Sequence, residues 1–324
     1  MSLFNSSSRR PWHTVRVLGR GSYGVVYLAI HAKHNGNGLI RQRIAVKTAL
    51  LENAFSLIKE KRIYGVFRDC PEIAHCYYSQ ITVEGGLMHY NLVLEYAPGG
   101  TLEDVIGLGL PENDVRVYTR TILRGLRCMH EKGYVHCDVK PSNILAFPSD
   151  HRQGDDSAAA AYRLKLADLG TAKEPEEDVP REKLVGKFRV TPHYSPPEVA
   201  GSGIVLPASD IWSLGCTVVE MICGCNSLWP EYEHLSAEEF ACRLVGSSSL
   251  TPKIPPLMSE DGKDFLRKCF QRDPRDRWTA EMLLGHPYVN GLNSDASVLN
   301  SSLQWDYPDN YLPQLVQGCV CTIL

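Results

Sequence analysis

Residues 134–145 read Tyr-Val-His-Cys-Asp-Val-Lys-Pro-Ser-Asn-Ile-Leu and bring an acid, a base and an amide close together in the chain. Asp138 can accept the proton of an attacking hydroxyl, Lys140 can offset charge on a transferred phosphoryl group, and Asn143 can hold a magnesium ion. Phosphoryl transfer needs positioning, charge neutralisation and Mg²⁺ more than covalent help from the protein. The stretch therefore predicts a catalytic loop, provided that the chain also supplies a nucleotide site.

A glycine-rich segment near the N-terminus supplies the nucleotide element. Residues 19–26 read Gly-Arg-Gly-Ser-Tyr-Gly-Val-Val, and Gly19, Gly21 and Gly24 would let the backbone approach a phosphate closely. A dinucleotide-binding unit requires a helix at this point, whereas β-type sequence follows here. We therefore expect a glycine-rich hairpin lying over the nucleotide.

A lysine and a second acidic motif complete the pattern. Lys47 lies on a predicted strand, where it can hold the α- and β-phosphates, and Glu60 on the next helix can fix its side chain. Glu52 is the alternative partner of Lys47. Asp168, in Asp-Leu-Gly after a strand-like run, supplies a carboxylate for the metal.

Composition narrows the class of protein. The chain has 324 residues, 44% of them hydrophobic and 22% charged, which is typical of a globular protein large enough for two lobes. A net charge of −3 without a long Lys/Arg run argues against nucleic acid as the main partner. The 11 cysteines lack metal-site spacing and predict reduced thiols of an intracellular protein. No apolar run is long enough for a signal peptide or a membrane span.

The apolar periodicity predicts an α+β fold with a strand-rich N-terminal lobe and a helical C-terminal lobe. Strands are predicted at 15–18, 25–30, 44–48 and 90–94, and helices at 54–66, 115–131, 209–223, 262–270 and 280–284. The apolar positions of the first helix are Phe55, Ile58, Ile63 and Val66, and those of the second are Val115, Tyr118, Ile122, Leu126 and Met129.

The predicted domain boundaries follow from turn-forming residues and from changes in composition along the chain. Ala-Pro-Gly-Gly at 97–100 is typical of a hinge. The predicted segments are an N-terminal extension (1–11), an N-lobe (12–96), a C-lobe (97–289) with a polar, alanine-rich insertion (148–161), and a C-terminal tail (290–324).

In this order the motifs resemble the eukaryotic protein kinase family over residues 12–289. The resemblance implies a two-lobed kinase fold, ATP and Mg²⁺ as cofactors, Asp138 as the catalytic base, and Asn143 with Asp168 on the metal. Implied nucleotide-binding residues are Leu18, Gly19, Gly21, Gly24, Val26, Ala45, Lys47, Glu60, Leu94, Glu95, Ala97 and Leu145. Among these, Val26 and Ala45 would contact the adenine, Leu94 would be the gatekeeper, and Glu95 and Ala97 would contribute hinge backbone contacts.

Further residues resemble serine/threonine-specific members of the family. Lys140 and Thr191 stand where those enzymes carry them, and Thr191 is expected to take part in catalysis through the catalytic loop. By the same resemblance, Glu198 would form a structural ion pair with Arg277. Asp210 would anchor the backbone of the catalytic loop.

Within the family, the chain resembles plant mitogen-activated protein (MAP) kinase kinase kinases of the MEKK-like group. The stretches that carry this likeness are residues 21–29, 136–138, 215–221, 263–266 and 277–280. The likeness implies a protein substrate that is itself a kinase, namely a MAP kinase kinase phosphorylated on serine and threonine in its activation loop. We expect a monomer in the cytoplasm, with the nucleus as an alternative location.

Cys137 stands directly before Asp138, where many kinases carry an arginine that binds a phosphate on the activation loop. Residues 172–190 contain no Ser, Thr or Tyr. We therefore hypothesise that activity does not require phosphorylation of this loop. The alternatives are that Cys137 is a tolerated replacement without regulatory meaning, or a redox sensor, which a neighbouring aspartate disfavours.

The last four residues, Cys321 to Leu324, fit a prenylation motif of the geranylgeranyl type, and Cys319 could carry a second acyl chain. No polybasic segment precedes the motif, so an unmodified C-terminus is an equal alternative. Membrane attachment is expected only if Cys321 is prenylated.

Two other functions compete with an active protein kinase. A pseudokinase scaffold would keep the fold for binding alone, but it leaves the full set of catalytic residues unexplained. A small-molecule kinase is disfavoured by residues 191–198, which in the family resembled here bind a peptide.

Overall fold

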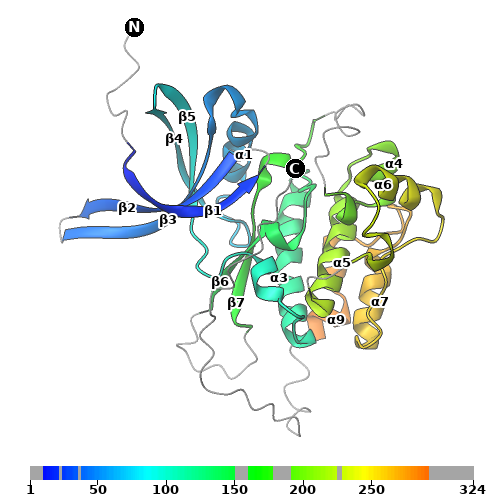
Figure 1. Ribbon diagram of the computed structural model, residues 1–324. Helices are drawn as coiled ribbons and strands as arrows, with labels where there is room; N and C mark the ends of the chain where they lie inside the picture. Colours follow the sequence, from blue (N-terminus) through cyan, green and yellow to red (C-terminus); the bar gives the residue numbers. More distant parts are fainter. Residues whose placement is uncertain are drawn as a thin grey trace, which may run out of the picture.

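The computed structural model describes residues 10–21, 24–35, 38–149, 160–177, 191–224 and 228–291. Figure 1 shows a strand-rich N-lobe and a helical C-lobe, which confirms the predicted α+β architecture. The N-terminal extension up to residue 9, most of the predicted insertion (150–159) and the tail from residue 292, with Cys319 and Cys321, lie outside the described residues. In the described part of the chain, no helix combines the length and the apolar character needed to cross a lipid bilayer.

The N-lobe is an antiparallel five-stranded sheet with the order β1-β2-β3-β5-β4. Its strands are β1 (Trp12–Gly21), β2 (Gly24–Asn35), β3 (Gly38–Leu50), β4 (Cys76–Glu84) and β5 (Leu87–Glu95). The four predicted strands are present, but β2 and β3 are much longer than expected and form a hairpin that projects from the lobe (Figure 1). The sequence prediction missed β4. Ile81 and Val83 of this edge strand remain exposed, so burial of one face does not mark it.

Helix α1 (Phe55–Val66) lies between this sheet and the short 3₁₀ turn η3 (Leu169–Thr171). The helix was predicted, and Ile63 of its expected apolar face is buried, but that face was wrong at its first two positions. Phe55 and Ile58 are exposed, whereas the buried residues are Leu57, Glu60, Ile63 and Tyr64. A glutamate occupies the centre of the buried face, which the apolar pattern alone does not indicate.

The C-lobe is built around α3 (Glu112–Glu131) and α5 (Pro207–Cys223), which pack against each other in one large apolar core. The apolar positions predicted for α3 are all buried, from Val115 to Met129. The remaining helices are α2 (Leu102–Ile106), α4 (Pro197–Ser202), α6 (Ala237–Gly246), α7 (Glu260–Cys269), α8 (Ala280–Leu284) and α9 (Pro287–Asn290). A two-stranded sheet, β6 (Ile144–Pro148) and β7 (Tyr162–Leu166), follows the catalytic loop and carries the predicted insertion at its open end. Other 3₁₀ turns are η1 (Leu51–Asn53), η2 (Pro141–Asn143), η5 (Pro192–Tyr194) and η6 (Pro230–Tyr232).

Candidate active site

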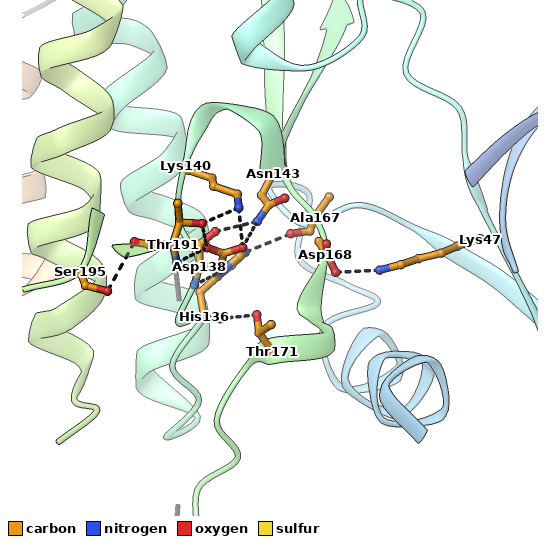
Figure 2. A network of polar contacts seen from close by, with 10 residues as sticks. All are labelled: Lys47, His136, Asp138, Lys140, Asn143, Ala167, Asp168, Thr171, Thr191 and Ser195. Atoms are coloured by element: carbon orange, nitrogen blue, oxygen red, sulfur yellow. Dashed lines mark hydrogen bonds and ion pairs between the residues drawn. The ribbon is translucent and has the colours of Figure 1, made fainter. Parts of the chain in front are cut away.

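Asp138 is surrounded by three side chains that the sequence predicted beside it (Figure 2). Its Oδ1 accepts hydrogen bonds from the backbone N–H (3.2 Å) and the hydroxyl (2.8 Å) of Thr191. Its Oδ2 accepts from Asn143 Nδ2 at 2.7 Å and lies 3.0 Å from Lys140 Nζ. Lys140 Nζ also donates to the Thr191 hydroxyl at 2.6 Å. Donors on both oxygens orient a carboxylate that could accept a proton, with a cation at its side.

The backbone of the catalytic loop is fixed by hydrogen bonds to Asp210 of α5. The carboxylate is 1% exposed and accepts from the N–H groups of His136 (2.8 Å) and Cys137 (2.9 Å). His130 Nε2 of α3 lies 2.8 Å from the same carboxylate. Cys137 has a left-handed backbone (φ 72°), which costs energy for a residue other than glycine. These paired backbone groups hold the strained loop in place, as the sequence led us to expect for Asp210.

Lys47 connects the N-lobe to the acidic motif at Asp168. Its Nζ lies 2.8 Å from Glu60 Oε2 and 2.7 Å from Asp168 Oδ1, whereas the alternative partner Glu52 is exposed. Burial would lower the pKa of Lys47, but the two carboxylates outweigh it and raise that pKa above its ordinary value. Burial also opposes ionisation of Asp168, yet Lys47 holds the pKa of this carboxyl below its ordinary value. Lys47 is therefore positioned and charged before a nucleotide arrives.

The donor set at Asn143 and Asp168 fits a magnesium ion. The Asn143 amide nitrogen donates to the Asp138 carbonyl oxygen (2.9 Å) as well as to its carboxylate, so the amide oxygen points away from Asp138 (Figure 2). Asp168 adopts a left-handed backbone (φ 58°) at the end of β7. No group of three His, Cys, Asp or Glu side chains in the described ranges could hold a metal alone. One carboxylate and one amide oxygen are what Mg²⁺ uses when substrate phosphates supply further ligands.

The predicted nucleotide contacts converge on one face of the N-lobe sheet. Val26 pairs with Lys47, and Ala45 pairs with Leu94, in the antiparallel ladders. Residues directly opposite each other point to the same side of a sheet, and Ala45 and Lys47 are two positions apart on β3, so these four side chains share a face. Gly24 (φ 142°) must be glycine, since a Cβ there would lie 2.2 Å from the carbonyl oxygen of Thr48.

The other predicted nucleotide-site residues come from several further elements. Leu18 and Gly19 are on β1, Gly21 ends it, Ala97 is buried after β5, and Leu145 is half-buried on β6. Glu95 was expected to contribute backbone contacts, and the structure adds a role for its side chain. Its carboxylate lies 2.7 and 2.8 Å from Lys165 Nζ of β7 and accepts from the His75 N–H at 2.5 Å. The end of β5 is thereby tied to the C-lobe.

Tyr64 is a further residue of the site, and no sequence motif indicated it. Its hydroxyl accepts a hydrogen bond of 3.2 Å from the backbone N–H of Asp168. Tyr64 lies one helical turn after Glu60, so the spacing of four residues was the available signal. The two side chains place α1 against both the lysine and the metal carboxylate.

The predicted ion pair between Glu198 and Arg277 is bidentate and buried. Nη1 and Nη2 of Arg277 lie 2.7 and 3.1 Å from the two carboxylate oxygens. Arg277 also donates to the carbonyl oxygens of Ala208 (2.7 Å) and Gln271 (2.9 Å). The pair joins the segment after Thr191 to the turn between α7 and α8, which contains Arg277.

A glutamate that titrates near neutral pH lies close to the segment after Thr191. The Tyr194 hydroxyl donates to Glu220 Oε2 at 2.5 Å. Burial, helped by the nearby Glu103, raises the pKa of Glu220 from its ordinary value of 4.5 to about 7. Between these values the folded chain keeps a proton that the unfolded chain has lost, so this group's stabilising contribution is lost as pH rises towards 7.

Replacing Glu220 by glutamine should remove this pH dependence. From about pH 5 to about pH 8, the melting temperature of Glu220→Gln relative to wild type should rise by roughly 2–4 °C, because the linkage amounts to about 2 kcal/mol and a chain of this size shifts by roughly 1–2 °C per kcal/mol. Thermal unfolding of both proteins at each pH measures the effect. Glu233→Gln, at an exposed glutamate, is the control. Equal differences for Glu220→Gln at the two pH values would contradict the assignment.

The chain is similar to known proteins over most of its length. A family model described as "Protein kinase domain" matches residues 12–289. The chain is 40% identical to "Mitogen-activated protein kinase kinase kinase 20" of Arabidopsis thaliana over 282 residues, which covers 86% of this chain and 78% of that protein. It is 37% identical to "Mitogen-activated protein kinase kinase kinase 17" of the same plant, over 86% of this chain and 69% of the relative. A longer relative, "Mitogen-activated protein kinase kinase kinase YODA", is 35% identical over 87% of this chain but only 29% of its own length.

Proposed function

The chain belongs to the protein kinase family and is a serine/threonine protein kinase of the MAP kinase kinase kinase type, and from this premise we propose that it transfers the γ-phosphate of ATP to a MAP kinase kinase. The observation that carries the proposal is the arrangement around Asp138. Thr191 and Lys140, which the serine/threonine-specific pattern requires, both contact the Asp138 carboxylate. The names of the relatives support the class of substrate.

The proposed roles follow from the geometry. Asp138 accepts the proton of the substrate hydroxyl, and Lys140 lies where it offsets charge on the transferred group. Lys47 would hold phosphate oxygens of ATP, and Asn143 with Asp168 would hold Mg²⁺. When bound, Mg²⁺ would neutralise charge on the phosphates. Because little covalent chemistry is required, alignment of these groups accounts for most of the rate.

A transfer assay tests the function. The purified chain is incubated with ATP, Mg²⁺ and a catalytically inactive MAP kinase kinase, and phosphorylated residues are located by mass spectrometry. We expect phosphate on serine and threonine of the substrate's activation loop, and no signal there when these residues are alanine. Binding of ATP without transfer to any protein would indicate a scaffold instead.

We also propose that the enzyme does not depend on phosphorylation of its own activation loop. Cys137 is 5% exposed and packs with Val135, Val199 and Val205, so the position before Asp138 offers no cation for a phosphate. The Cys137 thiol donates to the carbonyl oxygen of Val135 at 3.4 Å. Its burial also disfavours the redox-sensor alternative, because oxidation requires an accessible thiolate. Most of the loop's sequence without hydroxyl side chains (178–190) lies outside the described residues.

Phosphatase treatment should therefore leave the activity unchanged. Recombinant enzyme is treated with a broad-specificity protein phosphatase, the phosphatase is removed, and kcat is compared with that of mock-treated enzyme. Complete dephosphorylation is verified by intact mass. A large loss of kcat that is restored by phosphorylation within residues 171–191 would refute the proposal.

A further inference from the structure

Helix α1 is joined to the start of the activation segment by two ion pairs that no sequence motif indicated. Lys59 Nζ lies 2.7 Å from Glu177 Oε2, with the two side chains 15% and 25% exposed. Arg62, one turn along the helix, pairs with Glu174. Both cations belong to α1, and both carboxylates belong to the segment that follows η3. We refer to residues 174–177 as the acidic turn.

The acidic turn is itself fixed to the C-lobe. The Glu177 N–H donates to the Glu174 carbonyl oxygen (3.1 Å), and the Glu174 N–H donates to Glu177 Oε2 (3.2 Å). The preceding residue, Lys173, exchanges backbone hydrogen bonds of 3.0 and 2.8 Å with Val135, just before the catalytic loop. Lys173 Nζ also donates to the Val205 carbonyl oxygen at 3.2 Å. The turn therefore connects the C-lobe to α1 through hydrogen bonds and ion pairs.

The two cations of α1 flank Glu60 in the helix. Lys59 directly precedes it and Arg62 follows two positions later, so any displacement of their face of the helix also moves Glu60. Glu60 is 0% exposed and reaches Lys47 at 2.8 Å. At Gly170 the helix is already so close that a Cβ would lie 2.5 Å from Ser56 Oγ. The acidic turn thus acts on the Lys47–Glu60 ion pair through α1.

We infer that Glu174 and Glu177 are positioning residues whose carboxylates hold α1 in the arrangement that catalysis requires. A phosphate on an activation loop carries about −1.5 to −2 charges and orders its surroundings by pairing with cations. Two carboxylates that pair with Lys59 and Arg62 supply comparable charge permanently. This inference rests on the proposed function and deepens it, because it states how the same site is aligned without phosphorylation.

Charge reversal at Glu177 tests the inference. Glu177→Lys and Lys59→Glu should each lower kcat/KM for ATP by about tenfold, the effect of losing roughly 1.4 kcal/mol of alignment, while KM for the protein substrate stays unchanged. The double variant Lys59→Glu, Glu177→Lys should recover part of the activity because the pair forms again with the charges exchanged, although the Glu174 N–H loses its acceptor at residue 177. Glu177→Gln should show a smaller loss in the same direction. Glu176→Lys, at an exposed neighbour in the same turn, is the matched control.

Amide hydrogen exchange of residues 55–66 provides a readout that does not require activity. Glu177→Lys should increase exchange in α1 relative to Glu176→Lys, and the double variant should reverse the increase. Equal behaviour of Glu177→Lys and Glu176→Lys in both measurements, or a double variant no better than the single ones, would overturn the inference. An inactive wild-type protein would refute the proposed function, and the exchange comparison would still decide whether the acidic turn holds α1.

Discussion

Replacing Asp138 by asparagine should lower kcat roughly 10³-fold, within the range that a positioned general base contributes, with little change in the affinity for ATP. In the wild-type structure, both carboxylate oxygens accept hydrogen bonds, from Thr191 on one side and from Asn143 on the other. An asparagine has one accepting oxygen, so its NH₂ group must face one of these donors. The variant loses the base and disturbs the positions of its neighbours.

Steady-state kinetics with the MAP kinase kinase substrate and a direct measurement of ATP binding separate these effects. Asp69→Asn, at a side chain that is 98% exposed, serves as the control. Activity of Asp138→Asn close to wild type would exclude Asp138 as the base. Weak ATP binding with normal kcat at saturation would place the residue in nucleotide binding instead.

Replacing Arg277 by methionine should lower the free energy of unfolding by about 3–5 kcal/mol, because it leaves the buried Glu198 carboxylate without its cation. Two carbonyl oxygens, those of Ala208 and Gln271, also lose a donor. A shift of the urea midpoint measures the loss. Because removal of both charges spares the cost of an unpaired buried carboxylate, the double variant Glu198→Leu, Arg277→Met should lose less than Arg277→Met alone.

Arg275→Met is the matched control for this loss. Arg275 lies in the same turn, but its side chain is 87% exposed and pairs with Asp273 at the surface. Such pairs contribute about 0–1 kcal/mol. Equal midpoint shifts for Arg275→Met and Arg277→Met would show that burial of the Glu198–Arg277 pair contributes no additional stability.

The sequence predicted those parts of the fold whose residues form a recognisable pattern within one continuous stretch of the chain. Helix α3 was predicted because its apolar residues recur at helical spacing, and α5 because its residues are strongly apolar throughout; both are buried in the core. The apolar face expected for α1 was wrong at Phe55 and Ile58, which are exposed, because the buried face includes Glu60, the predicted partner of Lys47. Apolar periodicity assigns charged residues to the surface, whereas Glu60 is buried because it forms an ion pair with Lys47.

The same distinction applies to the candidate site. Asp138, Lys140 and Asn143 lie within one short stretch, and their spacing made them visible in the sequence. The contacts of α1 with Glu174 and Glu177 join residues more than 100 positions apart. In the sequence, these charged residues cannot be distinguished from solvated surface residues. Only the fold brings them into contact. The lengths of β2 and β3 were underestimated for a related reason, since backbone pairing in a projecting hairpin does not depend on alternating burial.

The surroundings of Cys137 oppose conversion of this enzyme into one that is controlled by phosphorylation of its activation loop. An arginine introduced there would have to enter the apolar cluster of Val135, Val199 and Val205. Burial of an unpaired guanidinium costs several kcal/mol. It would also need a hydroxyl-bearing residue to be modified opposite it, and residues 172–190 offer none. Conversion in evolution or in the laboratory therefore requires coordinated changes at several sites, and a single exchange at this position should yield a damaged enzyme rather than a switchable one.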